Sequence, residues 1–175
     1  MRDSVKIYTD GACSNNQSKT NTGGYGGIIL IKEQEYIRLS DGYRNTTNNR
    51  MELMAVIKAL EKIDVDSSVI VYSDSEYVVK GITEWVPKWI KRGKIEKNGD
   101  LWMDLYRIVK TFEDIEFKHV KGHSNDYYNE IADKLAIAPS TVTRFVDKLT
   151  EKGLVEREKE GKKSYTKITK KGIAE

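Results

Sequence analysis

Four acidic residues lie where an α/β fold gathers functional groups. Asp10 and Asp74 each follow a short apolar run that is typical of a β-strand. Glu52 lies near the start of a helical pattern, and Asp133 lies in a later one. Hard divalent cations bind through several carboxylate oxygens, whereas clustered carboxylates without a cation repel one another. The residue types therefore suit two Mg²⁺ ions about 3.5–4 Å apart, an arrangement that performs phosphoryl-type transfer.

Each of these residues, taken alone, also has a purely structural interpretation. An aspartate at a strand end is commonly a turn residue or a helix cap. A glutamate in a first helical turn commonly interacts with the helix dipole. Spacing alone does not show that the four side chains converge, so both interpretations stay open at this point.

The predicted elements alternate in the order that is typical of an α/β protein. Strands are predicted at Val5–Thr9, Ile28–Ile31, Tyr36–Tyr43, Val69–Tyr72 and Ile115–Val120. Helices are predicted over Met51–Glu61, behind N-cap candidates at Thr46–Asn49, then after Asp74 to about Ile82, over Leu101–Phe112 and over Tyr128–Ala136. Three early strands followed by alternating helices and strands imply a mixed α/β sheet, with strand ends that bring Asp10 and Asp74 to one edge.

The composition narrows the class of protein. Charged residues make up 33% and hydrophobic residues 38% of the chain, which is typical of a soluble globular protein. No apolar run is long enough to cross a bilayer, and we expect neither a signal peptide nor a membrane partner. The single cysteine, Cys13, excludes an intramolecular disulfide and favours a reducing, cytoplasmic setting. We also expect a monomer.

The positive charge is concentrated in the last part of the sequence. From Pro139 onward there are 10 Lys/Arg against 6 Asp/Glu, whereas the preceding residues carry 20 against 21. A basic tail on a nearly neutral body favours a nucleic-acid partner, although a solvated surface has the same composition.

Residues from about Val5 to Ala136 resemble a type 1 ribonuclease H. The segments that carry the resemblance are Ile7–Asn16, Thr47–Ala55, Tyr72–Ser75, His119–His123 and Asn129–Asp133. They occur in the order that the family has. The resemblance implies a ribonuclease H-like mixed five-stranded sheet flanked by helices, and hydrolysis of the RNA strand of RNA–DNA hybrids.

The resemblance also implies a role for each acidic residue. Asp10, Glu52, Asp74 and Asp133 would hold two Mg²⁺ ions, for which Mn²⁺ can substitute. One ion would activate a water and the other would stabilise the leaving 3′-oxygen, which gives 5′-phosphate and 3′-hydroxyl ends. His123 would assist proton transfer or product release; its alternative interpretation is an ordinary loop histidine.

Substrate-binding residues follow from the same resemblance. Cys13, Asn16 and Asn48 match positions that read the 2′-hydroxyl, the group that distinguishes RNA from DNA. Thr47 and Asn16 match residues that seat a DNA phosphate. Glu76 departs from the family, which leads us to expect a glutamine there that touches the hybrid. Because a carboxylate repels phosphate, Glu76 either lowers the activity or turns aside.

The segment around Trp85 resembles the basic protrusion with which the family grips the DNA strand. The residues that match it are Trp85, Lys88, Trp89, Lys91 and Arg92. Aromatic side chains stack on sugars or bases, and basic side chains neutralise phosphates. The alternative is an amphipathic helix with buried tryptophans and a solvated charged face.

The C-terminal part resembles a MarR-type winged helix regulator. Ile137–Leu149 matches the turn and recognition helix, and Gly153–Thr169 matches the wing. We therefore predict a ribonuclease H domain over residues 1–136 and a partial winged helix segment over 137–175, which share the helix 128–136. Two family signatures that overlap in one helix favour the hypothesis of a constructed chimera.

The winged helix resemblance implies contacts with duplex DNA. Ser140, Thr141, Thr143 and Arg144 would face a major groove, and Lys162 and Lys163 would reach phosphates. The alternative is a solvated basic surface with weak, non-specific attraction. Three functions therefore remain: a hybrid-cutting nuclease, a DNA-binding module with the nuclease fold as scaffold, and a transposase-like strand transferase. The intact carboxylates and 2′-hydroxyl-reading segments favour the first.

Overall fold

The computed structural model describes residues 1–14, 21–95, 97–122, 126–160 and 163–174. The chain divides into two compact units, Met1–Ser140 and Thr141–Glu175. In the part of the chain that the structure describes, no helix combines the length and the apolar character needed to span a bilayer.

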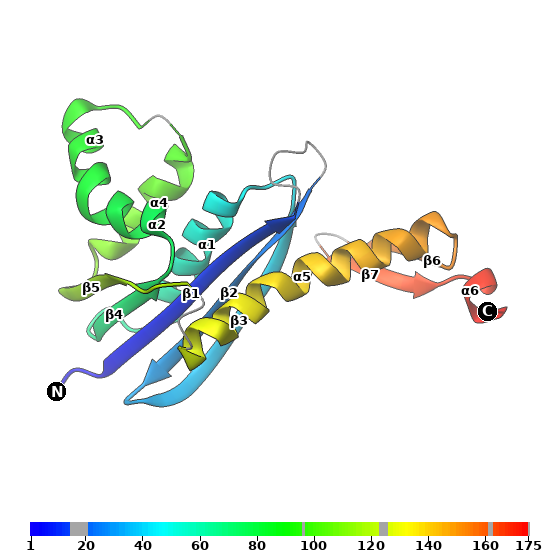
Figure 1. The fold of residues 1–175 in the computed structure, drawn as a ribbon, viewed down its shortest axis with the longest axis horizontal. Coiled ribbons are helices and arrows are strands. Elements are labelled where there is room, and N and C mark those ends of the chain that lie inside the picture. Colours follow the sequence, from blue (N-terminus) through cyan, green and yellow to red (C-terminus); the bar gives the residue numbers. More distant parts are fainter. Residues whose placement is uncertain (15–20, 96, 123–125, 161–162, 175) are drawn as a thin grey trace. The chain divides into compact units, whose positions relative to one another are not determined.

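A five-stranded sheet forms the centre of the first unit (Figure 1). Its strands are β1 (Ser4–Ser14), β2 (Thr22–Ile31), β3 (Gln34–Arg44), β4 (Ser68–Ser73) and β5 (Asp114–His119), in the order β3-β2-β1-β4-β5. β1, β2 and β3 pair antiparallel, whereas β4 pairs parallel with both β1 and β5. The prediction of a mixed five-stranded sheet is confirmed.

Strand β1 is longer than the predicted strand. It continues through Asp10 and Gly11 to Ser14, so the predicted strand end at Thr9 is wrong. The reason lies in its neighbour, because Asp10 pairs with Gly26 and Gly11 with Tyr25 in a continuous ladder with β2. The metal-binding candidate Asp10 therefore projects from the interior of a strand rather than from a loop.

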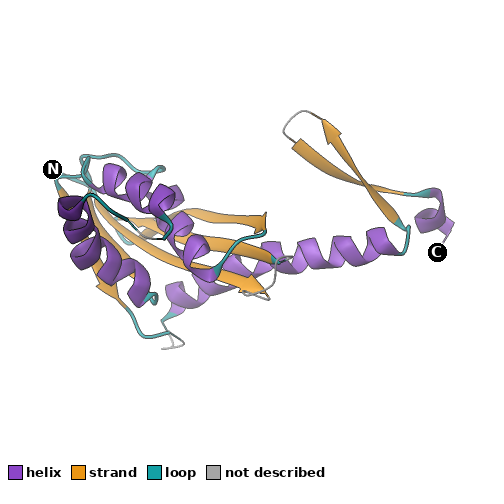
Figure 2. Cartoon of the chain, turned by 90° about the horizontal axis from the view of Figure 1, so that it is seen from above, coloured by secondary structure: helices purple, strands orange, loops and turns teal. Residues whose placement is uncertain are grey.

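The helices cover both faces of this sheet (Figure 2). They are α1 (Asn48–Leu60), α2 (Glu76–Lys80), a π-helical turn (Gly81–Trp85), α3 (Val86–Arg92), α4 (Gly99–Val109) and the start of α5 (Tyr127–Glu151). On one face, Val5 and Ile7 pack with buried residues of α1 and α4, Trp102 among them. On the other face, Tyr8 and Ile28 pack with Ala132 of α5. Alternate residues of β1 thus face opposite layers, as the strand period of two requires.

Helix α5 runs without interruption through the turn that the sequence predicted at Ile137–Ser140, so that prediction is wrong. Pro139 lies inside the helix and has no N–H to donate to the carbonyl of Leu135. The hydroxyl of Ser40 in β3 donates a 2.6 Å hydrogen bond to this carbonyl instead. A contact distant in sequence thus replaces the helical bond that proline removes.

The second unit consists of the end of α5, a hairpin and a short helix. The hairpin strands are β6 (Val155–Glu160) and β7 (Lys163–Ile168), which pair antiparallel, and α6 spans Lys170–Ala174. Gly153 follows α5 with φ +70°, the left-handed conformation that favours glycine after a helix. This hairpin lies within Gly153–Thr169, the range that the resemblance assigned to the wing.

Candidate active site

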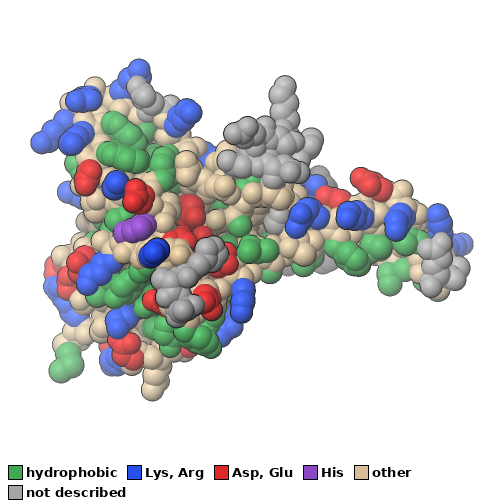
Figure 3. Space-filling view, viewed as in Figure 1, with side chains coloured by type: hydrophobic (Ala, Val, Ile, Leu, Met, Phe, Trp, Pro, Cys, Tyr) green, Lys and Arg blue, Asp and Glu red, His purple; other side chains and the backbone are tan. Residues whose placement is uncertain are grey.

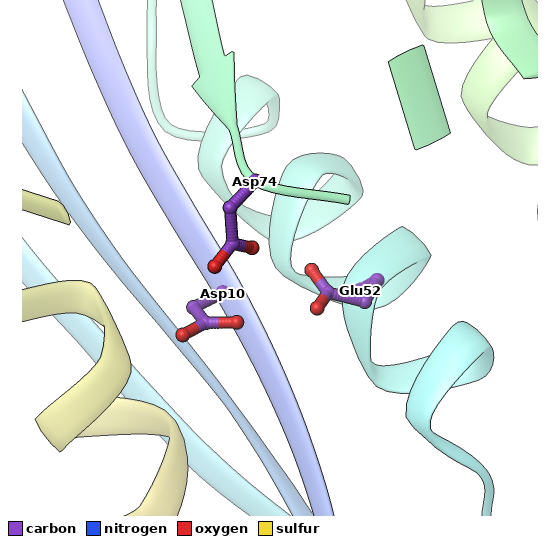
Figure 4. A group of neighbouring side chains, drawn as sticks. All are labelled: Asp10, Glu52 and Asp74. Atoms are coloured by element: carbon purple, nitrogen blue, oxygen red, sulfur yellow. The ribbon is translucent and has the colours of Figure 1, made fainter. Parts of the chain in front are cut away.

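Three of the four predicted carboxylates converge. Asp10 projects from β1, Glu52 from the first half of α1, and Asp74 from the residue after β4 (Figure 4). Each offers an oxygen atom, and these atoms lie within 4.8 Å of one another. Such an acidic group supplies the oxygen ligands that hard divalent cations require.

The elements explain why these side chains meet. Thr9 of β1 and Ser73 of β4 are register partners in a parallel pair, so Asp10 and Asp74 leave the same end of adjacent strands. Gly11 lets α1 approach: a Cβ at this position would lie 2.6 Å from the main-chain carbon of Met51 and would overlap the nitrogen of Glu52. The absence of a side chain at Gly11 therefore allows Glu52 to lie beside β1.

Burial and mutual repulsion disfavour the charged forms of two of these groups. Burial, with the charge of Asp74 next, raises the pKa of Asp10 to about 7. Burial, followed by the charges of Asp10 and Asp74, raises the pKa of Glu52 well above its usual range. Glu52 is 8% exposed, and its Oε2 atom makes no hydrogen bond among the described residues. A divalent cation would both neutralise the cluster and coordinate this oxygen, so the residues fit the metal that the resemblance implies.

Asp133 does not belong to the group of three. It is half-buried on α5, and the structure places its charge near enough to raise the pKa of Asp10, after the larger effects of burial and Asp74. The cluster within 4.8 Å contains Asp10, Glu52 and Asp74 only, among the residues that the structure describes. The fourth predicted ligand thus lies beside the cluster rather than within it.

The predicted substrate-binding residues lie on the elements that carry the carboxylates. Cys13 is half-buried in β1, and its thiol lies 3.6 Å from the carbonyl oxygen of Thr46. Thr47 caps α1 by accepting a 3.2 Å hydrogen bond from the main-chain nitrogen of Arg50, and Asn48 is exposed as the first residue of the helix. Asn16 and His123 lie outside the described residues.

The tryptophans of the predicted protrusion are half-buried in an aromatic cluster. The ring centroids of Trp85 and Trp89 lie 6.0 Å apart, and Trp89 lies 5.9 Å from Trp102. Trp85 also lies 5.8 Å from Tyr77. Lys88, Lys91 and Arg92 are exposed. The cluster gives these tryptophans a packing role, and the basic side chains beside them face solvent.

Glu76, which departs from the family pattern, pairs with a lysine of its own helix. Its carboxylate lies 3.0 Å from the Nζ atom of Lys80, one helical turn away. The hydrogen bond and charge of Lys80 lower the pKa of Glu76, and the charge of His119 adds to this effect. Lys80 holds the Glu76 carboxylate along the surface of α2. Because the ion pair is exposed, the carboxylate remains in contact with solvent.

Two features of the site were not predicted from the sequence. Arg50 forms a bidentate ion pair with Asp100, with nitrogen–oxygen distances of 3.0 and 2.7 Å, and thereby ties α1 to α4. His119 lies with its Nε2 atom 3.1 Å from the main-chain oxygen of Asp74. The sequence contained a signal for His119, because it begins the segment His119–His123 that carries the family resemblance.

The predicted DNA-binding residues of the C-terminal part are distributed over α5 and the hairpin. Thr141 and Arg144 are exposed on α5, with Lys148 one turn further on. Ser140 and Thr143 belong to α5 and Lys163 begins β7, but their side chains lie outside what the structure describes, as does Lys162 altogether. Lys and Arg line α5 on the face shown in Figure 3.

Comparison with known proteins relates each region to a family. Residues 2–140 match the RNase H family, and residues 128–156 match the family described as winged helix-turn-helix DNA-binding. The two matches overlap over residues 128–140, within helix α5.

Curated relatives and solved structures agree with the first match. The chain is 46% identical to a ribonuclease H of Chromobacterium violaceum, over 77% of this chain and 92% of the relative. It is also 46% identical to a ribonuclease H of Trichodesmium erythraeum, over 79% and 90%. Among solved structures, LC9-RNase H1, a type 1 RNase H with the type 2 active-site motif, has a TM-score of 0.70 at 29% identity and covers 81% of this chain and 74% of its own. The PFV RNase H domain has a TM-score of 0.70 at 28% identity, over 81% and 97%. The chain therefore belongs to the ribonuclease H family.

Proposed function

We propose that this chain cuts the RNA strand of RNA–DNA hybrids endonucleolytically, with two Mg²⁺ ions, or Mn²⁺ in their place, held by Asp10, Glu52 and Asp74 and completed by Asp133. The observation that carries the proposal is the convergence of three carboxylates within 4.8 Å in a chain of the ribonuclease H family. The products carry 5′-phosphate and 3′-hydroxyl ends. The enzyme acts as a monomer in the cytoplasm, a setting that suits its one free cysteine.

The residues in and around the cluster have separate roles in metal binding, substrate binding and proton transfer. Bound ions of this kind stabilise charge on phosphoryl oxygens and lower the pKa of a bound water. Asp10, Glu52 and Asp74 would hold the ions, and Gly11 permits the close approach of α1 that brings Glu52 beside β1. Cys13 and Asn48, with Asn16, contact the 2′-hydroxyl, and Thr47 seats a phosphate of the DNA strand. His123 moves a proton or assists the departure of product.

The basic segment after the π-helical turn extends the substrate site. Lys88, Lys91 and Arg92 face solvent and neutralise phosphates of the DNA strand. Trp85 and Trp89 hold this segment through their packing and present half-exposed rings for contact with the strand. Arg50 and Asp100 connect the helix that carries Glu52 to the start of α4, which follows this segment in the chain.

A cleavage assay with three labelled nucleic acids tests the proposal. RNA–DNA hybrid, duplex DNA and single-stranded RNA are each incubated with the full chain and Mg²⁺, beside the Asp10→Asn variant. We expect cleavage of the hybrid RNA alone by the wild type and none by the variant, which has lost a metal ligand. Intact hybrid RNA in the wild-type reaction would refute the proposal, and strand transfer on duplex DNA would favour the transposase-like alternative.

A second function, duplex DNA binding by the C-terminal unit, is favoured by the winged helix-turn-helix match over residues 128–156. Because α5 is continuous, its C-terminal half is not set off by a turn as a separate recognition helix. We propose that Arg144 and Lys148, both exposed and one turn apart, contact phosphates without reading bases. Ser140, Thr141, Thr143, Lys162 and Lys163 contribute further polar contacts.

The salt dependence of binding tests this second function. Duplex DNA binding is measured in an Asp10→Asn background that does not cut, with and without the double substitution Arg144→Ala and Lys148→Ala. Loss of two phosphate contacts should reduce the slope of log K against log salt by about 2. Scrambling the DNA sequence should leave the affinity within about twofold, since phosphate contacts carry no sequence information. An unchanged slope would show that these residues touch no phosphate.

A further inference from the structure

His119 ends β5 at the edge of the sheet where the carboxylates gather. It is the register partner of Ser73, and the main-chain nitrogen of Val120 donates a 3.0 Å hydrogen bond to the carbonyl of Ser73. The last rung of the parallel pair therefore fixes His119 beside the residue that follows Ser73, which is Asp74. The imidazole reaches that residue, with Nε2 3.1 Å from its main-chain oxygen.

The hydrogen bond has only one chemically possible direction. A carbonyl oxygen accepts, so Nε2 of His119 must carry the hydrogen and donate it. The acceptor lies where β4 has ended and α2 has not begun, because β4 ends at Ser73 and Ser75 caps α2 through a 3.3 Å bond to the nitrogen of Val78. The peptide of Asp74 thus lies between the two elements, where the imidazole donates a hydrogen bond to its main-chain oxygen.

Gly122, three residues after His119, also lies beside the carboxylate of Asp74. A Cβ at Gly122 would lie 3.1 Å from Oδ2 of Asp74, tighter than an ordinary contact. The charge of His119 acts on Glu76 as well, where it adds to the larger effect of Lys80 in lowering the pKa. The imidazole therefore lies against the strand-to-helix junction that carries Asp74, and the following loop passes the carboxylate itself.

We propose that His119 is a positioning residue: by donating Nε2–H to the main-chain oxygen of Asp74, it fixes the orientation of this carboxylate and thereby strengthens metal binding. The inference rests on the proposed function only in assigning Asp74 to the metal site. A residue that orients a metal ligand through a hydrogen bond typically changes metal affinity by about 10- to 100-fold when it is replaced. His119 needs no contact with the substrate or the ion to have this effect.

Two substitutions separate the hydrogen bond from the bulk of the ring. In His119→Gln, the side-chain amide nitrogen can take the place of Nε2 and donate to the same oxygen. In His119→Leu, comparable volume remains but the donor is lost. Mn²⁺ binding to the full chain is measured by titration calorimetry without nucleic acid, and thermal unfolding of both variants reports whether they fold.

We expect His119→Leu to weaken Mn²⁺ binding about 10-fold and His119→Gln to stay within about twofold of wild type. Cleavage should show the same order, with more Mg²⁺ needed by His119→Leu at half-maximal rate and an unchanged KM for the hybrid. Wild-type affinity in His119→Leu, or equal losses in both variants, would overturn the inference. If the wild-type chain binds Mn²⁺ but leaves hybrid RNA intact, the proposed function fails, while the calorimetric comparison still tests His119.

Discussion

The hydroxyl of Ser40 donates a 2.6 Å hydrogen bond to the main-chain carbonyl of Leu135, the carbonyl that an N–H at position 139 would otherwise reach. Position 139 is proline, which ordinarily breaks or kinks a helix because it removes this bond and crowds the preceding turn. The strand β3 supplies the missing donor, so helix α5 continues from the first unit into the second.

Replacement of Ser40 by alanine should therefore destabilise the chain by about 0.5–1 kcal/mol, the usual net value of an accessible hydrogen bond. In a Pro139→Ala background the restored N–H can bond to Leu135, so the same Ser40→Ala substitution should cost much less. Urea unfolding of the four proteins in this double-mutant cycle measures the difference. An equal cost in both backgrounds would show that Ser40 does not compensate for the proline.

The same contact explains which part of the fold the sequence could predict. The strands and α1 follow from local hydrophobic periodicity, and family motifs identified Asp10, Glu52 and Asp74 as one group. The continuity of α5 does not follow, because Pro139 signals a break locally and its compensation comes from Ser40, which lies 95 positions before Leu135. The extension of β1 past Asp10 likewise depends on the pairing of Gly11 with Tyr25 in β2.

The position of Asp133 beside the carboxylate group, rather than within it, has a similar origin. The position of Asp133 depends on the distance between α5 and the sheet. Glycines of the sheet strands that face α5 set this distance. A Cβ at Gly26 would lie 2.5 Å from the nitrogen of Ala136 and would overlap the carbonyl of Ala132. Helical periodicity identifies the face that carries Asp133, but it contains no information on this distance.

Gly26→Ala should destabilise the first unit by about 2–3 kcal/mol or more, because α5 must move away from β2 to admit a methyl group. Gly27→Ala is the matched control: its nearest neighbour would lie at 3.6 Å, an ordinary contact. Both residues lie in β2 and lose the same backbone freedom, so the difference between them isolates the close approach of α5. Urea denaturation measures both variants, and equal stabilities would contradict the packing described for α5.

Asp10→Asn should stabilise the metal-free protein above neutral pH while it removes activity. In the folded state the pKa of Asp10 is raised from 3.8 to about 7, so the folded protein holds a proton that the unfolded chain releases. The stability associated with this proton is present below about pH 4 and is lost as the pH rises through about 7. Asparagine stays neutral, so at pH 8 in EDTA the free energy of unfolding of Asp10→Asn should exceed that of the wild type by on the order of 2 kcal/mol.

Thermal unfolding between pH 4 and pH 8 checks this expectation, with exposed Asp66→Asn as the control that should retain the wild-type profile. Addition of Mg²⁺ at pH 8 should raise the unfolding temperature of the wild type more than that of Asp10→Asn, because the ion offsets the repulsion that the substitution has already removed. A wild-type protein whose stability in EDTA rises from pH 5 to pH 8 relative to Asp10→Asn would contradict the sign of the pKa shift.

Glu76→Gln should lower the KM for hybrid by about two- to fivefold at low salt and leave kcat nearly unchanged. The substitution removes a negative charge near Asp74. It also frees Lys80, whose Nζ atom lies 3.0 Å from the Glu76 carboxylate, to attract phosphate. Little stability should be lost, since exposed ion pairs contribute at most about 1 kcal/mol. Glu61→Gln is the matched control, because Glu61 also forms an exposed helical pair, with Lys58 at 3.4 Å, but lies about 14 Å along α1 from Glu52. Steady-state kinetics at two salt concentrations distinguish the two variants. The decrease in KM caused by Glu76→Gln should be smaller at high salt. An equal decrease in KM for Glu61→Gln would show that only net charge matters.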